Sequence, residues 1–203
     1  MKLYYVPGVC SLCPHIVLRE GGFDFTLDLV DVKNGKKTQS GEDYVAINPR
    51  GYVPALRLDD GKILHEAAVI VQFLADQKPE SKLAPPNGTM ARVELQEWLN
   101  FISSELHKGM SVFFQPAATE ELRAVFKARL DARFGVLAEQ VKGTWLMGEQ
   151  FTVADAYAFY VMRMFMKNPA IKGELNDTLR AYYQRIAARP AVQAALTAEQ
   201  LDA

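Results

Sequence analysis

The chain contains two cysteines, Cys10 and Cys13, in the segment VCSLCPH near its N-terminus. A C-x-x-C pair can act as a redox dithiol or ligate a metal, or one thiol can act alone as a nucleophile. A structural zinc site needs four ligands, and the three histidines, His15, His65 and His107, are dispersed singly. Metal binding is therefore the weakest interpretation, and thiolate or redox chemistry at the cysteines remains.

The position of Cys10 favours a chemical role. It follows a short strand pattern over residues 2–6 and a Pro-Gly turn, and a helical pattern begins at Ser11. Backbone N–H groups and the dipole at a helix N-terminus lower the pKa of a thiol, so we expect thiolate at Cys10. The alternative is a small buried apolar residue, which is common for a free cysteine and more so for Cys13, one turn into the helix.

Two other segments could bind a peptide. Pro54 follows Val53 where a strand begins, and such a proline can present the preceding backbone N–H and C=O to an extended peptide, particularly if the bond is cis. Glu66 and Ala67 begin a helical pattern, where a carboxylate beside free N–H groups can receive a ligand carrying an ammonium and a carboxylate. The structural alternatives are an edge-strand proline and an ordinary N-terminal glutamate.

The segment 90–110 has the periodicity of a helix with one apolar face and one uncharged polar face. At about 100° per residue, the apolar face comprises Leu95, Trp98, Leu99, Ile102 and Leu106. The opposite face comprises Asn100, Ser104, His107 and Ser111. A solvated face would more often carry Lys and Glu, so this face predicts the lining of a cavity. A surface that lacks charge is the alternative.

The elements that position these residues fall into two halves. Strand patterns over residues 2–6, 25–32, 53–58 and 62–64 alternate with helical patterns over residues 11–20 and 66–74. A polar loop over 33–41 and an irregular stretch separate the second strand from the third. This order predicts an α/β domain with a mixed sheet over residues 1–78.

A linker rich in proline and glycine is predicted over residues 79–89, followed by an all-helical domain over residues 90–203. Its helical patterns cover residues 90–110, 120–142, 153–166, 174–188 and 191–198. Thr152 and Asp155 have the spacing of a capping box at the start of one of these helices.

The composition indicates which classes of partner and which cellular location to expect. The chain is 49% apolar and 23% charged with a net charge of −1, so it has no basic field for nucleic acid or anionic lipid. It has no apolar run long enough to span a membrane, and its N-terminus lacks the apolar segment of a signal peptide. We expect a cytoplasmic protein that binds no nucleic acid and no membrane, with its thiols reduced.

Together the motifs are similar to those of a known family. C-S-x-x-P-H after the first strand, N-P-x-G-x-V-P, H-E, W-L-N-F-I-S-S-E-L-H-K and F-T-V-A-D occur here in the order found in bacterial cytosolic glutathione transferases of the beta class. The resemblance covers Met1 to Leu201. It implies a thioredoxin-like N-terminal domain, a C-terminal helical bundle domain and a homodimer. It also implies glutathione as co-substrate in a cleft between the halves, with no metal.

The resemblance also implies roles for individual residues. Cys10 would lie beside the glutathione sulfur, where it can form a mixed disulfide, and His107 would help to stabilise a thiolate. The backbone of Val53, ahead of a cis Pro54, would pair with the cysteinyl part of glutathione. Glu66 and the residue after it would hold the γ-glutamyl end. The remaining residues that it places at the glutathione site are Lys36, Tyr52, Ala67, Asn100, Ser104 and Lys108.

The implied activity is conjugation of glutathione to electrophilic, apolar or aromatic small molecules, as in detoxification. Ala67 departs from the serine or glycine usual in the family, which predicts one missing hydrogen bond of about 0.5–1.5 kcal/mol. Cys13 departs as well. As a resolving thiol it would make the protein a glutathione-dependent thiol-disulfide oxidoreductase, and a non-enzymatic binding protein is a third class. Retention of Cys10, Glu66 and His107 favours the transferase, whose physiological electrophile the sequence does not specify.

Overall fold

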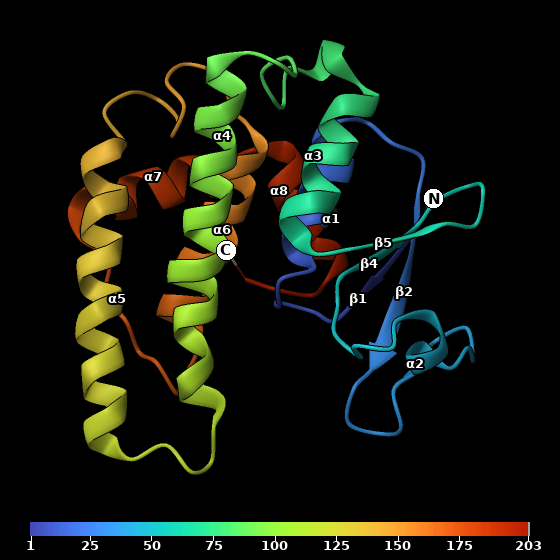
Figure 1. The fold of residues 1–203 in the computed structure, drawn as a ribbon, viewed down its shortest axis with the longest axis horizontal. Coiled ribbons are helices and arrows are strands. Elements are labelled where there is room, and N and C mark those ends of the chain that lie inside the picture. The colour runs from blue at the N-terminus through green and yellow to red at the C-terminus, as the bar shows by residue number, and fades with distance from the viewer. Residues whose placement is uncertain (203) are drawn as a thin grey trace. The chain divides into compact units, whose positions relative to one another are not determined.

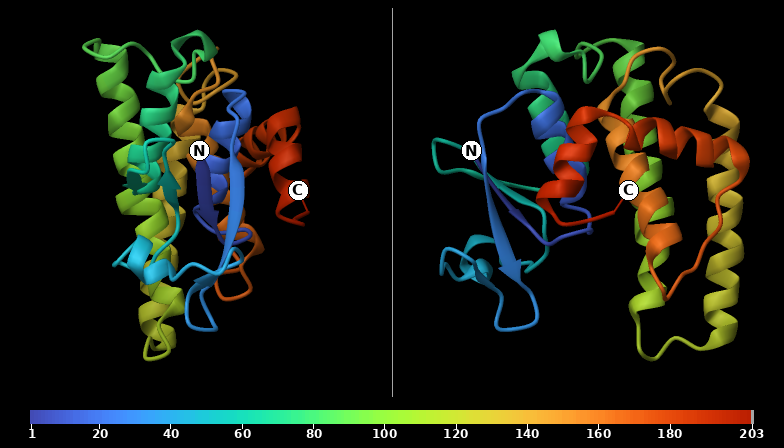
Figure 2. Two further views of the ribbon diagram at one scale, coloured as in Figure 1. Left: turned by 90° about the vertical axis from the view of Figure 1, so that its right-hand side faces the viewer. Right: turned by 180° about the vertical axis from the view of Figure 1, so that it is seen from behind.

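The computed structural model describes residues 1–202, which divide into two compact units. The first unit comprises Met1–Leu83 together with the residues from Arg189 onward, and the second comprises Ala84–Ala188. The sequence pattern grouped residues 90–203 as one helical domain. By packing, the last helix, α8 (Pro190–Ala198), belongs with the first unit, where it lies against α1 (Leu12–Glu20) (Figure 2). No described helix has the length and apolar character needed to cross a bilayer.

The first unit is built on a five-stranded mixed sheet with the order β3-β2-β1-β4-β5, of which Figure 1 labels β1, β2, β4 and β5. The strands are β1 (Lys2–Tyr5), β2 (Thr26–Asp31), β3 (Lys37–Thr38), β4 (Ala55–Arg57) and β5 (Ile63–His65). β1 pairs with β2 in parallel, and every other pair in this order is antiparallel. The predicted mixed sheet is confirmed.

The sheet buries side chains on both faces, because successive residues of a strand point to opposite sides. Leu3 and Leu56 are buried on one face. On the other face, Tyr4 and Ala55 form a cluster with Tyr44 of the four-residue helix α2 (Tyr44–Ile47). The sequence pattern gave an irregular stretch here, because four residues are too few to show helical periodicity.

The helices of this unit begin and end at identifiable residues. α1 ends at a Gly-Gly pair, as predicted, and α2 begins where the Asp43 side chain accepts a hydrogen bond from the Val45 N–H. α3 (Ala67–Gln77) begins at Ala67, with Glu66 as the N-cap residue directly after β5, and a short 3₁₀ turn, η1 (Pro79–Ser81), follows it. Because β1 and β5 are both antiparallel to β4, the β1–α1 loop and the β5–α3 junction lie at the same end of the strands.

The second unit is entirely helical. Its elements are α4 (Met90–Phe101), η2 (Ile102–His107), η3 (Lys108–Phe114), α5 (Glu120–Gln140), α6 (Val153–Lys167) and α7 (Asp177–Ala187). The predicted single helix over 90–110 is wrong in detail, since η2 is π-helical and η3 is 3₁₀. The predicted capping box of α6 is confirmed, with the Thr152 N–H donating to Asp155 Oδ2 at 2.7 Å.

Candidate functional site

The thiol of Cys10 lies against the backbone of Val53. Its Sγ donates a hydrogen bond to the Val53 carbonyl oxygen at 3.1 Å, and the Val53–Pro54 peptide bond that follows is cis. The segments that contain Cys10 and Val53 are distant in the sequence and were predicted independently as candidate site segments, and this hydrogen bond shows that they are adjacent. Cys13 is also a free thiol, but its side chain is fully buried in α1, at 0% exposure.

Cys10 does not have the lowered pKa that its place in the sequence predicts. Burial raises the pKa of the thiol to about 12, and the nearby Glu66 carboxylate raises it further. The backbone N–H groups of Cys10 and Ser11 act in the opposite direction but more weakly. α1 begins only at Leu12, so Cys10 precedes the first turn of the helix. The thiol is therefore a neutral hydrogen-bond donor at neutral pH.

A buried polar network holds the loop that carries Cys10. Glu199 accepts the Gly8 N–H on Oε2 at 2.8 Å, and its Oε1 lies 2.7 Å from Nδ1 of His15. Nε2 of His15 accepts from Nε of Arg19 at 2.9 Å, so the Nδ1 proton is directed to Glu199. Gly8 has φ +71°, which favours glycine at this turn. No local sequence pattern indicates a role for Glu199, because its partners lie at the other end of the chain.

The segment before Val53 is fixed by two side chains near α2. The Tyr52 carbonyl accepts from the Tyr44 hydroxyl at 2.7 Å and from Asn48 Nδ2 at 2.6 Å. The Lys36 ammonium lies against Gly51, so closely that a Cβ at Gly51 would meet Nζ. Lys36 and Tyr52, both predicted site residues, therefore lie in neighbouring loops, as the resemblance implies.

Glu66 has an unusual backbone conformation. Its φ is +66°, a region that non-glycine residues rarely occupy and that carries a strain of about 1–3 kcal/mol. Its carboxylate is exposed and pairs with Arg50 at 2.7 Å, a contact that the sequence did not indicate. Ala67 is the first residue of α3 and is buried, and no described side chain caps this helix. The α3 N-terminus therefore presents backbone N–H groups beside a carboxylate.

The polar face predicted for residues 90–110 is not continuous. Asn100, Ser104 and Lys108 are exposed, and the Ser104 hydroxyl donates to the Asn100 carbonyl at 2.9 Å. The π-helical turns of η2 have more residues per turn than an α-helix, so the 100° spacing fails after Ile102. His107 is directed instead toward α6.

His107 is held between two tyrosines of α6. Its Nδ1 lies 2.9 Å from the Tyr157 hydroxyl and its Nε2 lies 3.2 Å from the Tyr160 hydroxyl. Burial lowers the pKa of His107 to about 4. A neutral imidazole has one donor and one acceptor nitrogen, and these two hydroxyls engage both. In this arrangement the imidazole is neutral and hydrogen-bonded to both tyrosines, so it supplies no positive charge.

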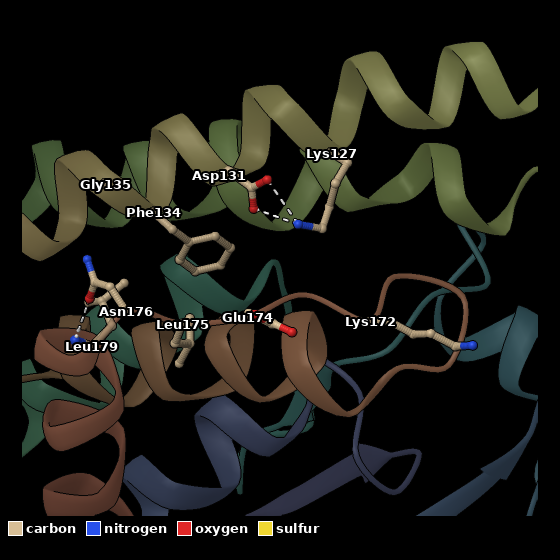
Figure 3. Close-up of a pocket in the computed structure, with 9 residues that line it drawn as sticks. All are labelled: Lys127, Asp131, Phe134, Gly135, Lys172, Glu174, Leu175, Asn176 and Leu179. Atoms are coloured by element: carbon tan, nitrogen blue, oxygen red, sulfur yellow. Dashed lines mark hydrogen bonds and ion pairs between the residues drawn. The ribbon is translucent and has the colours of Figure 1, made fainter.

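The helical unit has a separate pocket of about 430 Å³ between α5 and the segment that leads into α7 (Figure 3). Lys127 and Asp131 form an ion pair on one wall, at 2.7 Å, and Phe134 and Leu179 contribute apolar surface. No residue that the sequence placed at the glutathione site lines this pocket. Among the described residues, no group of three or more His, Cys, Asp and Glu side chains is gathered to hold a metal ion.

Comparison with known proteins identifies the family to which the chain belongs. The family model for the glutathione S-transferase N-terminal domain matches residues 9–77, and the model for the C-terminal domain matches residues 104–199. The glutathione S-transferase GstA of Escherichia coli is 46% identical over 204 positions, which cover 99% of this chain and 100% of that protein. The chain belongs to the glutathione S-transferase family.

Solved glutathione S-transferases have the same fold. The ternary complex of BphK, a bacterial enzyme of the family, has a TM-score of 0.94 at 48% identity and covers 99% of this chain and 100% of its own. A beta-class transferase from Sphingomonas chungbukensis has a TM-score of 0.92 at 39% identity, covering 100% of both chains. A sphingomonad transferase solved with glutathione has a TM-score of 0.90 at 41% identity, again covering 100% of both. The expected thioredoxin-like and helical architecture is confirmed, and glutathione is the co-substrate of the family.

Proposed function

We propose that this chain conjugates glutathione to small electrophiles, with the cysteinyl part of glutathione on the backbone of Val53 and the Cys10 thiol beside its sulfur. The observation that carries this proposal is the hydrogen bond from Cys10 to the carbonyl of Val53, ahead of the cis Pro54. It puts a thiol at the backbone group that an extended peptide would pair with.

The γ-glutamyl end of glutathione carries an ammonium and a carboxylate. The exposed Glu66 carboxylate suits the ammonium, and the N–H groups at the start of α3 suit the carboxylate. Lys36 and Tyr52 flank the same segment and are further glutathione ligands in this proposal. The strained backbone at Glu66 supports the assignment, because such residues gather at binding sites.

The reaction needs the glutathione thiol to be ionised. Its proton leaves to solvent, the thiolate forms a bond to an electrophilic carbon, and the leaving group departs with its electron pair. Cys10, held protonated by burial, has one S–H; when glutathione pairs with the Val53 backbone, that proton can turn from the Val53 carbonyl to the thiolate and so favour the ionised form. This role differs from the thiolate first expected at Cys10 and requires the raised pKa.

The helical unit completes the proposal. Asn100, Ser104 and Lys108 are assigned to glutathione, and Lys108 carries the positive charge that His107 lacks. His107 acts as a positioning residue between Tyr157 and Tyr160. The second substrate is an apolar or aromatic electrophile.

A homodimer in the cytoplasm is also part of the proposal. The exposed apolar side chains of Met90 and Val93, three residues apart on α4 and so neighbours on its surface, support self-association. Light scattering after size exclusion tests it, with twice the chain mass expected and the single-chain mass contradicting it.

Conjugation of glutathione to chlorodinitrobenzene tests the activity, with the product followed by absorbance. We expect turnover that saturates with glutathione, and a KM for glutathione raised about tenfold or more in Glu66→Gln, because a charged hydrogen bond contributes about 1.5–3 kcal/mol. Glu139→Gln, an exposed change near the end of α5, is the matched control and should leave the KM unchanged. Absence of conjugation, or equal KM values in the two variants, would contradict the proposal.

The alternative of a dithiol oxidoreductase requires Cys13 to reach Cys10. The complete burial of Cys13 disfavours that role. Its signature would be a Cys10–Cys13 disulfide, which peptide mapping detects.

A further inference from the structure

We propose that Tyr44 and Asn48 are positioning residues that aim the Val53 N–H at glutathione by clamping the carbonyl of the residue before it. The inference rests on the proposed function, in which the Val53 backbone pairs with glutathione. It adds two residues that donate to the carbonyl of Tyr52 and thereby set the direction of a ligand-binding group.

The argument begins with the geometry of one peptide group. The Tyr52 carbonyl and the Val53 N–H belong to the same planar unit, so the direction of one fixes the direction of the other. That carbonyl accepts two short hydrogen bonds, at 2.7 Å from Tyr44 and 2.6 Å from Asn48. Both lone pairs of the oxygen are engaged, which resists rotation of the plane in either sense.

The two donors are themselves fixed. Tyr44 is fully buried and Asn48 is 2% exposed. The Tyr44 ring packs on Tyr4 with centroids 5.7 Å apart, and burial raises the pKa of Tyr44 to about 12, so its hydroxyl stays a donor. Asn48 Oδ1 accepts the Arg50 N–H at 3.1 Å, which orients the Asn48 amide with its nitrogen toward Tyr52.

The two hydrogen bonds to the Tyr52 carbonyl matter because the Tyr52 side chain makes no described hydrogen bond that would hold the loop in place. The Tyr52 side chain is 74% exposed, and the preceding Gly51 has φ +67° and the conformational freedom of glycine. The described contacts that hold this peptide in place are therefore made to its backbone. Loss of one donor should let the plane rotate and weaken the pairing of Val53 with glutathione.

The experiment compares Tyr44→Phe with Tyr4→Phe. Both tyrosines are fully buried in the same cluster and each variant loses one hydroxyl, but Tyr4 donates to Glu42 and not to the loop. We would measure the Kd of S-methylglutathione by calorimetry, kcat and KM for conjugation, and the thermal unfolding midpoint. Tyr44→Phe should raise the Kd and the KM for glutathione about three- to tenfold with kcat nearly unchanged, while Tyr4→Phe lowers the midpoint and leaves the Kd as in the parent.

Equal Kd values in the parent and Tyr44→Phe, or an equal rise in Tyr4→Phe, would overturn the inference. If Tyr44→Phe does not fold, Asn48→Asp takes its place, since it keeps the acceptor for Arg50 and replaces the donor with an oxygen. It should weaken binding of S-methylglutathione by at least as much, and unchanged binding would overturn the inference. A parent protein that does not bind S-methylglutathione would instead contradict the proposed function.

Discussion

The Sγ of Cys10 and the carbonyl oxygen of Val53 are 3.1 Å apart and share a hydrogen bond. A thiol that donates in this way is favoured in its neutral form, and burial acts in the same direction. The site therefore holds a protonated cysteine at the backbone group proposed to pair with glutathione. Two predictions about ionisation and two about binding and stability follow from the surrounding contacts.

Alkylation of Cys10 should be slow at neutral pH and should accelerate with pH. Because only the thiolate reacts and the pKa of Cys10 is raised to about 12, the rate should rise about tenfold per pH unit from pH 7 to 10. The measurement is iodoacetamide labelling of the native protein followed by peptide mass spectrometry. A rate that levels off above about pH 9 would show an ordinary thiol, whose pKa is about 8.5, and contradict the account. Denatured protein provides the control for unhindered labelling.

His107 should make folding sensitive to mild acid. Its folded pKa, about 4, lies below the ordinary value of 6.5, so its contribution to stability is present above pH 6.5 and is lost as the pH falls toward 4. The measurement is the free energy of unfolding by urea at pH 7 and pH 5. The parent should lose more stability over this interval than His107→Gln, which has no proton to bind. An equal loss in both proteins would mean that His107 is not buried as described.

Glu199→Ala should destabilise the fold and disturb the Cys10 loop together. Removing the carboxylate leaves the Gly8 N–H and the Nδ1 of His15 without their shared acceptor and releases the ring that accepts from Arg19, and breaking such a buried network costs about 3–5 kcal/mol. Chemical unfolding measures the loss, and the KM for glutathione should rise as well. Glu139→Ala, on the surface, should change stability by less than about 0.5 kcal/mol. A loss of the same small size in Glu199→Ala would contradict the described network.

Ala67→Ser should tighten glutathione binding. The hydroxyl would stand at the first position of α3, where it can donate to the glutamyl carboxylate, and one such bond contributes about 0.5–1.5 kcal/mol. The KM for glutathione should fall about two- to tenfold. Ala68→Ser, one position further along the helix, is the control and should show no such gain. A KM that rises in Ala67→Ser would mean that the buried position has no room for the oxygen.

Local patterns were sufficient to predict many of the elements. β1, β2, α1, the β4–β5 hairpin and the capping box at Thr152 and Asp155 each depend on neighbouring residues, so their signals lie within short windows of sequence. The two-residue strand β3 lies in the stretch 33–41 that the sequence predicts as a loop, because two residues are too few to show alternation. α2 is too short to show a period, and the π-helical turns of η2 rotate His107 away from the face that α-helical spacing assigns to it.

Local patterns singled out Cys10, Val53 and Glu66 one by one, but not the contacts that hold them in place. Contacts such as Glu199 to Gly8, Arg50 to Glu66 and Tyr44 to Tyr52 join segments whose separation no periodicity encodes. The pKa of Cys10 was also out of reach, because it depends on burial by distant segments as well as on the position of the thiol before a helix.

The most direct test of the central claim is peptide mapping after incubation with oxidised glutathione near pH 8. The small fraction of Cys10 that is ionised at this pH would attack one sulfur of the disulfide, slowly forming a mixed disulfide and releasing one glutathione as the thiolate. The account predicts one glutathione on Cys10 with Cys13 still free, formed more slowly when S-methylglutathione competes for the site. A Cys10–Cys13 disulfide, or modification that S-methylglutathione does not slow, would contradict it.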